Sequence, residues 1–363
     1  MFTLLQALYI NTSMNLNDLY EELDLVALGT AADVVPLIDE NRILTKFGIK
    51  RMRETGNTGL AALMEVSGSV KGNVNSNNII HILAPRLNAP GRLSSASKTV
   101  DLLTSNNWLK ALKIADEIEK ENATRRHMND QVFVEAEAML HSANMEFGAE
   151  GVVLASQNWH QGVIGIAASR IVEKYNSPTI LISLENDIDK GSARSIKGFD
   201  ICSAISECEN ILENYGGHKY AVGLTIKANK IDTLKERFNE IIKRELPSGI
   251  PKSFIKIDAE IDLSCLNDDM IRFLDKLSPY GESNPIPVFL TRNLHVVNDS
   301  RIVGNNHLKF KVTDGYRFFD AIGFNMGNYK DKVRPNNSPI EILYNVEENE
   351  WRGRKNIQLV IKA

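Results

Sequence analysis

A strand–helix–strand pattern in the middle of the chain constrains the fold more than any other feature. Residues 151–156 form a short apolar run, residues 162–175 have helical periodicity, and residues 179–183 form a second apolar run. A chain with this order makes a βαβ unit, in which the two strands are parallel and the crossover is right-handed. The sequence therefore predicts an α/β domain here.

The segments that follow extend this domain. Residues 200–215 have the pattern of a helix, residues 221–226 that of a strand, and residues 231–246 that of a second helix. Pro247, Gly249 and Pro251 then predict a linker.

Short strand-like runs with Gly and Asn turns fill the rest of the chain, and they predict a small β-barrel. The expected strands are 254–261, 288–297, 307–313, 317–324, 340–347 and 356–361.

The part before the α/β domain is expected to be mixed. Residues 23–28 form a short apolar run that suits the end of a buried strand, and residues 41–53 have the pattern of a helix. Residues 108–142 form a long helical segment with few apolar positions, which indicates a spacer between domains.

Charge is unevenly distributed along the chain. The net charge is −4, yet residues 289–363 hold 12 Lys and Arg against 8 Asp and Glu, so this part is +4 and the remainder −8. The same part holds nine aromatic residues. Basic residues interleaved with aromatic ones favour a surface on which single-stranded nucleic acid stacks.

The compartment is expected to be the cytoplasm. The three cysteines have no paired spacing, which fits a reducing environment, and no apolar run is long enough to span a membrane.

Asp33 is a candidate metal ligand. It follows the apolar run and the turn at Gly29 and Thr30. A carboxylate at the carboxyl end of a buried strand suits Mg²⁺ or Mn²⁺, which prefer oxygen ligands. The alternative is a turn or helix N-cap aspartate, which is the commoner role for this pattern.

Two arginines flank a Pro- and Gly-rich segment, residues 84–93, that is expected to form a rigid turn. Arg86 and Arg92 would present planar guanidinium groups that match a phosphate. The alternative is a surface loop with two solvated arginines.

Two loops of the α/β domain are candidate anion sites. His160 precedes a predicted helix, where it would contact a phosphate or a base, or cap the helix. Ser192, Arg194 and Ser195 follow Gly191, and two hydroxyl groups beside an arginine predict a phosphate cradle. A solvated hydrophilic loop is the alternative for the second segment.

A third loop is predicted at residues 215–223. Gly216 and Gly217 would end a helix and let the backbone approach a ligand closely. His218 would then be presented in a loop, which favours a ligand-binding role over a structural one.

Taken in this order, the five motifs resemble the RecJ family of the DHH phosphoesterase superfamily. The resemblance includes residues 277–285, 320–324 and 349–353 and so covers essentially the whole chain. It implies a 5′-to-3′ exonuclease that acts on single-stranded DNA with Mn²⁺ or Mg²⁺ in DNA repair and recombination.

The resemblance also implies a domain organisation. Residues 1–107 would be the C-terminal part of a DHH domain, 108–145 a connecting helix, 146–250 the DHH-associated nucleic-acid-binding domain, and 251–363 an OB-fold barrel.

Residue roles are carried over from the same resemblance. Asp33 matches a metal ligand, and His218 matches a histidine near the scissile phosphate. Ser192 and Arg194 match a pocket for the 5′ phosphate, which one of Arg86 and Arg92 joins. A DNA track on the barrel would hold Lys309, Lys311, Phe318, Trp351, Arg352 and Arg354.

The chain departs from the family in one respect. The Asp-His-His motif and earlier aspartates of the family lie upstream of the Asp33 motif, and this sequence has only 32 residues there and no Asp-His-His. Because hydrolysis with two metal ions needs several ligands, we expect this chain alone to bind without cleaving, and a separate N-terminal DHH fragment is a candidate partner. Two alternatives are a nuclease-inactive single-strand-binding protein and a phosphodiesterase for small substrates.

Overall fold

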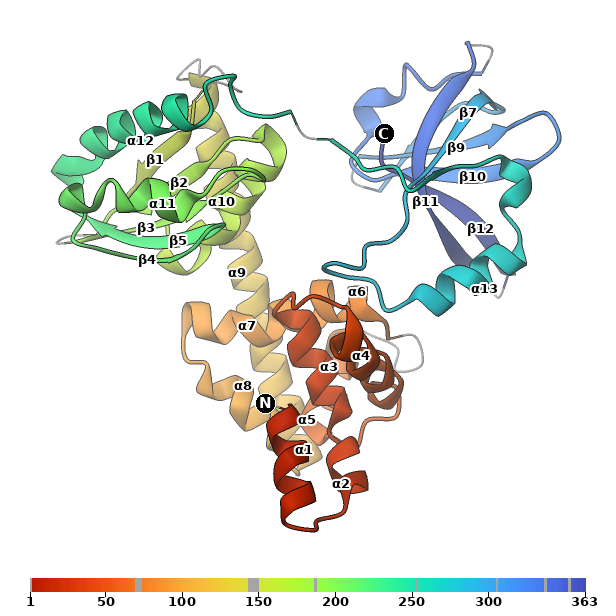
Figure 1. The fold of residues 1–363 in the computed structure, drawn as a ribbon, viewed down its shortest axis with the longest axis horizontal. Coiled ribbons are helices and arrows are strands. Elements are labelled where there is room, and N and C mark those ends of the chain that lie inside the picture. Colours follow the sequence, from red (N-terminus) through yellow and green to blue (C-terminus); the bar gives the residue numbers. More distant parts are fainter. Residues whose placement is uncertain are drawn as a thin grey trace. The chain divides into compact units, whose positions relative to one another are not determined.

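The computed structural model describes residues 2–68, 74–142, 150–185, 188–252, 254–304, 306–335, 338–351 and 354–363. The chain forms two compact units (Figure 1). The first unit comprises Met1–Gly56, Val70–His81 and Ile255–Ala363, and the second comprises Asn57–Ser69 and Ile82–Phe254. The division into four domains made from the sequence remains a prediction.

Helices form the N-terminal part of the first unit: α1 (Phe2–Asn11), α2 (Leu16–Tyr20), α3 (Leu23–Ala32), α4 (Asp39–Met52) and α6 (Ser76–Asn78). The strand expected at residues 23–28 is wrong, because this run begins α3. Its buried residues Ala27, Leu28 and Ala31 recur at helical spacing. Helix α4 packs closely against α3 at Gly48, where an added Cβ would lie 2.1 Å from the Leu23 carbonyl oxygen.

The C-terminal part of the first unit is a closed sheet. Its strands run in the order β6-β7-β11-β12-β10-β9-β8, and an additional β7–β9 pairing joins five of them into a ring. Alternate residues of β9, such as Leu308, Phe310 and Val312, point into its core. The strands and the adjoining helix are β6 (Ala259–Glu260), β7 (Phe289–Val296), β8 (Arg301–Val303), β9 (His307–Thr313), β10 (Phe318–Gly323), β11 (Ile340–Trp351), β12 (Arg354–Ile361) and α13 (Asp268–Leu277).

The barrel expected from the sequence is confirmed, with two differences in its strands. Of the strand expected at residues 254–261, only Ala259–Glu260 forms a strand, β6, which pairs with β7. Strand β8 is an addition, since its three residues are too few to give an alternating pattern.

Helices also begin the second unit: α5 (Thr58–Val66), α7 (Ala84–Leu93), α8 (Ser97–Leu103) and α9 (Trp108–Ser142). Helix α9 has the bounds predicted for the long helix. The turn expected at residues 84–93 is wrong, because α7 accommodates Pro85 in its first turn, where no backbone N–H is needed.

A five-stranded sheet forms the core of the second unit, in the order β1-β2-β3-β5-β4. As predicted, β1 and β2 are parallel and α10 joins them. Helices α9 and α10 cover one face of the sheet, and α11 and α12 cover the other (Figure 1). The elements are β1 (Val152–Ser156), α10 (Gln161–Tyr175), β2 (Thr179–Ser183), β3 (Asp189–Arg194), α11 (Ile201–Ser206), β4 (Asn214–His218), β5 (Ala221–Ile226) and α12 (Ile231–Glu245).

Two loops expected in this domain are strands instead. The segment with Ser192 and Arg194 is β3, and the segment with Gly216 and His218 is β4. The helix expected at residues 200–215 therefore ends early, at Ser206. Strand pairing with β5 overrides the turn preference of the glycines, since β5 hydrogen-bonds to both strands.

No helix in the described ranges is both long enough and apolar enough to cross a membrane.

Candidate nucleic-acid interface

Three arginines from different elements gather in the second unit. Arg92 ends α7, Arg125 lies in the middle of α9, and Arg194 ends β3. None of the three forms an ion pair with any residue that the structure describes. Positive charges gathered without acidic partners make a site for an anion.

Two glycines of α10 allow these arginines to approach. An added Cβ at Gly162 would lie 2.2 Å from the Arg92 carbonyl oxygen, so the end of α7 packs directly on the start of α10. An added Cβ at Gly165 would lie 2.6 Å from Nη2 of Arg194 and 2.9 Å from Oγ of Ser192. The absence of side chains here lets the end of α7 and the Arg194 side chain lie directly against the first two turns of α10.

Removal from water and mutual repulsion both act on the three guanidinium groups. Burial lowers the pKa of Arg92, and burial together with the Arg92 charge lowers that of Arg194. Burial, followed by the charges of Arg92, Arg126 and Arg86, lowers the pKa of Arg125, and the charge of Asp130 acts against them. The guanidinium groups stay protonated at neutral pH and therefore repel one another. A bound anion would offset this repulsion, which favours its binding.

Arg125 is a member of this cluster that the sequence did not reveal, because it lies among the many charged residues of a long helix. Its Nη2 donates to Asn122 Oδ1 at 2.9 Å, while its Nε is buried and has no hydrogen-bond partner. One helical turn further, the buried Oδ1 of Asn129 also has none. Buried polar atoms without partners are uncommon. The Arg125 Nε–H is a donor that a bound anion would satisfy, whereas the Asn129 oxygen is an acceptor and needs a donor instead.

The two arginines proposed for the same role differ in their surroundings. Arg86 donates through Nε to the carboxylate of Glu119 on α9 and through Nη1 to the Ile82 carbonyl at 2.7 Å. Arg92 makes only a weak contact, from Nη1 to the Gly162 carbonyl at 3.3 Å. Arg92 is therefore free to bind a ligand, whereas Arg86 is neutralised by Glu119.

Arg194, Ser192 and His218 share one face of the sheet. Arg194 donates from Nη1 to Ser192 Oγ at 2.9 Å. Arg194 and His218 both pair with Ala221 of β5, so they lie in one row across the sheet, about 10 Å apart by strand spacing. His218 is exposed, and its Nδ1 accepts from the Tyr220 N–H at 3.3 Å.

The remaining candidates of this domain have structural roles in part. His160 Nδ1 accepts from the Gly162 N–H at 3.0 Å, so His160 caps α10. The Ser195 hydroxyl donates to the Phe199 carbonyl at 2.7 Å. Gly217 cannot carry a side chain, because an added Cβ would lie 2.2 Å from the Ala221 carbonyl oxygen, whereas the space around Gly216 is open.

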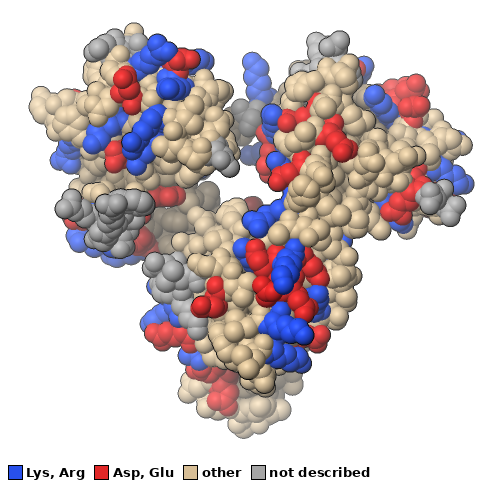
Figure 2. Space-filling view, turned by 180° about the vertical axis from the view of Figure 1, so that it is seen from behind, with Lys and Arg blue, Asp and Glu red and all other residues tan. Residues whose placement is uncertain are grey.

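The barrel presents basic and aromatic residues on the outer face of β9 and β10. Lys309 lies opposite Arg301 of β8, while Lys311 forms a 3.8 Å ion pair with Asp320. Phe318 is 57% exposed and begins β10. Arg301 was missed because its short strand gave no pattern. On the face drawn in Figure 2, basic and acidic side chains are interspersed. A DNA track therefore depends on local groups of basic residues, such as Lys309 and Arg301.

The rest of the expected DNA track is only partly described. Trp351 and Arg354 pair at the end of the β11–β12 hairpin. Arg352 lies outside the described residues.

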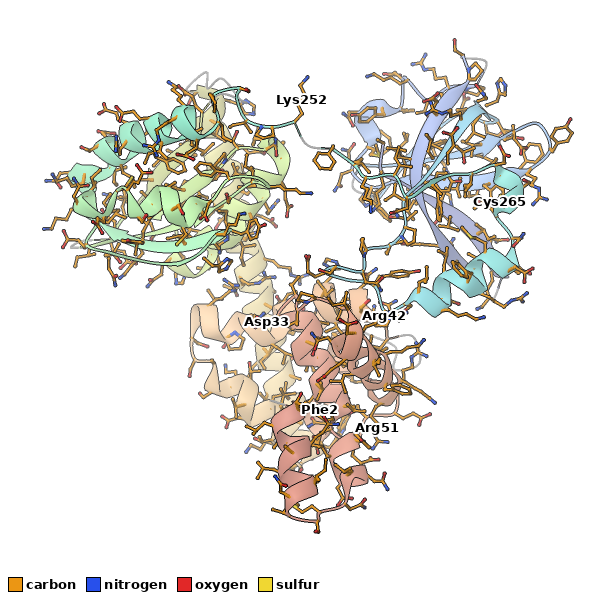
Figure 3. All side chains as sticks on the ribbon, in the orientation of Figure 1. Phe2, Asp33, Arg42, Arg51, Lys252 and Cys265 are labelled. Carbon is orange, nitrogen blue, oxygen red and sulfur yellow. The ribbon has the colours of Figure 1, made fainter. Side chains whose placement is uncertain are left out.

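Asp33 does not lie at the carboxyl end of a buried strand, as the sequence predicted. It follows the C-terminal end of α3, not a strand, and its side chain is exposed (Figure 3). It lines a largely apolar cavity of about 710 Å³ with residues that include Phe2, Leu25, Glu40 and Leu44. Within the described ranges, no three His, Cys, Asp or Glu side chains are grouped to hold a metal ion. These residues alone therefore do not fit a metal centre.

Two family models match the chain. Residues 148–244 match the DHHA1 domain, and residues 257–363 match the RecJ OB domain. The chain thus carries a DHHA1 domain followed by a RecJ OB domain. It also resembles curated relatives over nearly all its length, and it belongs to the RecJ family.

The relatives are longer than this chain. The single-stranded-DNA-specific exonuclease RecJ of Bacillus subtilis strain 168 is 39% identical over 350 residues, which are 94% of this chain and 44% of the relative. RecJ of Escherichia coli K12 is 33% identical over 358 residues, 95% of this chain and 61% of the relative. The chain therefore spans about half the length of the curated relatives it matches.

Solved structures agree with the fold. RecJ from Thermus thermophilus in complex with Mg²⁺ has a TM-score of 0.84 and 28% identity, covering 100% of this chain and 54% of that one. A RecJ exonuclease bound to manganese has a TM-score of 0.55 and 32% identity, covering 66% and 59%.

Proposed function

We propose that this chain supplies the single-stranded-DNA-binding part of a RecJ-type 5′-to-3′ exonuclease of DNA repair and recombination. The observation that carries the proposal is the cluster of Arg92, Arg125 and Arg194, three guanidinium groups that form no ion pair in the described parts of the chain. The relatives named as single-stranded-DNA-specific exonucleases support the choice of substrate.

The arginine cluster is proposed to hold the 5′ phosphate. A terminal phosphate carries up to two negative charges and several acceptor oxygens, which planar guanidinium groups bind in pairs. Ser192 lies within hydrogen-bond distance of Arg194 and would add a hydroxyl donor. Arg92, and not the neutralised Arg86, is the arginine of α7 that we assign to this pocket.

The barrel is proposed to bind the strand by charge and stacking. Lys309 and Arg301 lie side by side on neighbouring strands, and two like charges in that position repel each other unless an anion lies between them. Phe318 offers an exposed ring on which a base can stack.

Hydrolysis is proposed to need ligands beyond those of the described residues. The structures of related RecJ proteins were determined with Mg²⁺ or Mn²⁺. Asp33 would contribute one carboxylate, and its position at the C-terminal end of a helix favours a nearby cation. We therefore expect this chain alone to bind DNA without cleaving it, and to support cleavage when an N-terminal DHH fragment with Asp-His-His is supplied.

Binding of a 3′-labelled single-stranded oligonucleotide with a 5′ phosphate or a 5′ hydroxyl tests the proposal. The wild-type chain should prefer the phosphate, and Arg92→Ala and Arg194→Ala should each remove most of that preference. Equal affinity for the two ends in the wild-type chain would refute the pocket.

A nuclease-inactive single-strand-binding protein is the second candidate. The exposed Phe318 ring and the adjacent Lys309 and Arg301 suit single-strand binding without hydrolysis as well. The two candidates differ in one assay. Degradation of the oligonucleotide in Mn²⁺ after addition of the DHH fragment of a relative supports the exonuclease, and intact oligonucleotide under those conditions supports the binding protein.

A further inference from the structure

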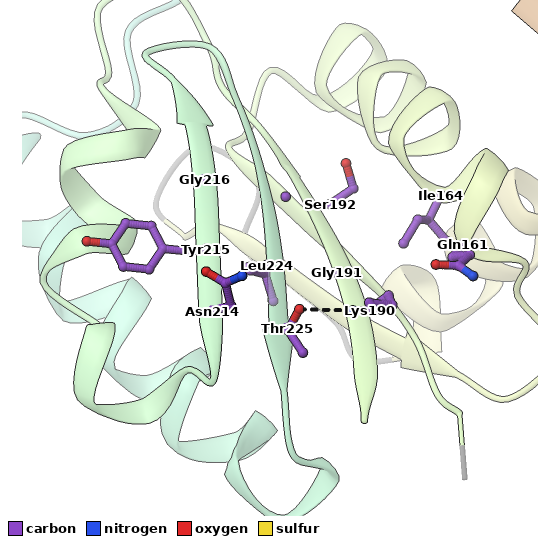
Figure 4. Close-up of a pocket in the computed structure, with 11 residues that line it drawn as sticks. Gln161, Ile164, Lys190, Gly191, Ser192, Asn214, Tyr215, Gly216, Leu224 and Thr225 are labelled. Carbon is purple, nitrogen blue, oxygen red and sulfur yellow. Dashed lines mark hydrogen bonds between the residues drawn. The ribbon is translucent and has the colours of Figure 1, made fainter. Parts of the chain in front are cut away.

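A hollow beside the arginine cluster is not explained by phosphate binding. It has a volume of about 410 Å³, within the range of small-molecule sites. It lies on the face of the sheet that α10 covers only in part, over β3, β5 and β4 (Figure 4). Gln161 and Ile164 of α10 form one wall, and the three strands form the floor.

Three rows of residues cross the sheet here: the second and third rows line the floor of the hollow, and the first row borders it. The first row is Arg194, Ala221 and His218, and the second is Ser192, Gly223 and Gly216. The third row is Lys190, Thr225 and Asn214. Because side chains alternate along each strand, all three rows face the same side, and adjacent rows are about 7 Å apart.

The middle row is a flat platform of bare backbone. Gly216 and Gly223 are paired across strands, and both are exposed. The space above them is open, since the nearest atom to an added Cβ at Gly223 is 3.9 Å away and Gly216 has none within 4 Å. Packing within the protein therefore does not require either glycine. Glycine in a strand weakens it, and it often marks the approach of a ligand to the backbone.

The third row supplies polar groups at the far edge of the platform. Lys190 Nζ donates to Thr225 Oγ1 at 3.3 Å (Figure 4) and forms no ion pair with a described residue. Asn214 is exposed beside Thr225. The side chain of Tyr215 points away from the hollow, as the alternation requires.

We propose that the Gly216–Gly223 platform holds the base of the nucleotide whose phosphate is bound at Arg194. The inference rests on the proposed function and adds the part of the substrate that this face recognises. A phosphate at the first row would place the base of its nucleotide one row away, over the glycines. The flat base would lie on the peptide groups, and the polar edge of the base would face Lys190, Thr225 and Asn214. Backbone contacts of this kind suit every base, as a sequence-tolerant nuclease requires.

Adding a side chain to the platform is the direct test. Gly223→Val and Gly216→Val place a β-branched side chain in open space on a strand, so we expect both variants to fold and to melt at or above the wild-type temperature. Gly56→Val is the matched control, because Gly56 lies in the other unit and an added Cβ there also meets nothing within 4 Å.

The probes are 3′-fluorescein single-stranded 12-mers that differ only at the 5′ end: a 5′-phosphorylated normal nucleotide, a 5′-phosphorylated abasic nucleotide, and a 5′-hydroxyl nucleotide. Dissociation constants are measured by anisotropy at constant salt with the full chain. Each platform variant should bind the normal 5′-phosphorylated probe about tenfold more weakly, the size of one base contact. It should bind the abasic probe as the wild-type chain does.

The outcomes separate this inference from the proposed function. If both variants bind all probes as tightly as the wild-type chain does, the platform assignment is wrong and the proposed function stands. An equal loss of affinity for the normal and abasic probes also refutes the platform assignment, because it would place the DNA backbone there instead of the base. A wild-type chain that binds no probe, or ignores the 5′ phosphate, overturns the proposed function and this inference with it.

Discussion

The guanidinium of Arg194 lies across the backbone of Gly165, so close that one added methyl group would stand 2.6 Å from Nη2. The same group would stand 2.9 Å from Ser192 Oγ. A single glycine of α10 thus fixes both side chains that we assign to the phosphate pocket.

Gly165→Ala should disturb binding more than folding. The obstructed atoms are the ends of side chains, which can move aside, and alanine favours a helix by about 1 kcal/mol over glycine. We expect nearly unchanged thermal stability and a reduced preference for a 5′ phosphate, measured by melting and by anisotropy. Gly29→Ala in α3 is the matched control, since an added Cβ there meets nothing within 4 Å. Retention of the full preference by Gly165→Ala would contradict the assignment.

Arg86→Ala and Arg92→Ala should have opposite profiles. Loss of Arg86 leaves the half-buried Glu119 carboxylate with only a 3.4 Å contact from Arg126, which should cost about 1–3 kcal/mol of unfolding free energy. Loss of Arg92 removes a cation without an ionic partner in the described structure, so stability should change little while binding of the 5′ phosphate weakens. Urea unfolding measures the stability of both variants, and anisotropy measures their binding of a 5′-phosphorylated strand. Weaker 5′-phosphate binding in Arg86→Ala, with Arg92→Ala unaffected, would assign the pocket to Arg86.

Gly48→Ala should destabilise the helical part of the first unit. The new Cβ would lie 2.1 Å from the Leu23 carbonyl oxygen and 2.5 Å from Ala27 Cβ, and the backbone cannot move aside as a side chain can. Overpacking of this kind costs about 1–3 kcal/mol. A urea midpoint equal to that of the wild-type chain would show that α3 and α4 do not pack this closely.

Glu137 should make stability fall in acid. Burial alone would raise the pKa of its carboxyl, but hydrogen bonds from Lys174 and Tyr175 outweigh burial and hold that pKa below its ordinary 4.5. A lowered carboxyl pKa contributes stability that is present above about pH 4.5 and is lost as the pH falls through the folded-state pKa. Melting temperatures between pH 6 and pH 3 should fall less steeply in Glu137→Gln than in the wild-type chain. Parallel curves for the two proteins would count against this ion pair.

Lys309 should contribute to the salt dependence of DNA binding more than Lys311. Each released counterion adds about 0.7 to the slope of log affinity against log salt for a single strand. Lys309→Ala should lower the slope by about that amount, whereas Lys311→Ala should lower it less, since Lys311 is paired with Asp320. Equal slopes for the wild-type chain and Lys309→Ala would remove β9 from the proposed track.

The sequence predicted the elements whose patterns are long or strongly apolar. Helix α9, the parallel pair β1 and β2, and most barrel strands lie where periodicity placed them. It failed where tertiary pairing decides the conformation. The glycines of β3 and β4 indicated turns, but their cross-strand partners in β5 make them strands, and the short run that begins α3 fits a helix as well as a strand.

The site was predictable only in part, for a similar reason. Arg92, Ser192, Arg194 and His218 stand out in motifs, and the structure places Ser192, Arg194 and His218 on one sheet face. Arg125 and Gly165 have no local signal, because their importance comes from α7, α9, α10 and β3 meeting in space.

The glycines of β4 have a further consequence, for self-association. β4 is the outermost strand of its sheet, so one side of its backbone has no partner strand among the residues that the structure describes. An exposed edge invites a second chain to add to the sheet and aggregate. With Gly216 and Gly217 at its centre and only five residues in length, β4 gives an incoming strand few side chains to pack against. The sequence that keeps the backbone bare for a nucleotide also makes this edge a poor template for another protein molecule.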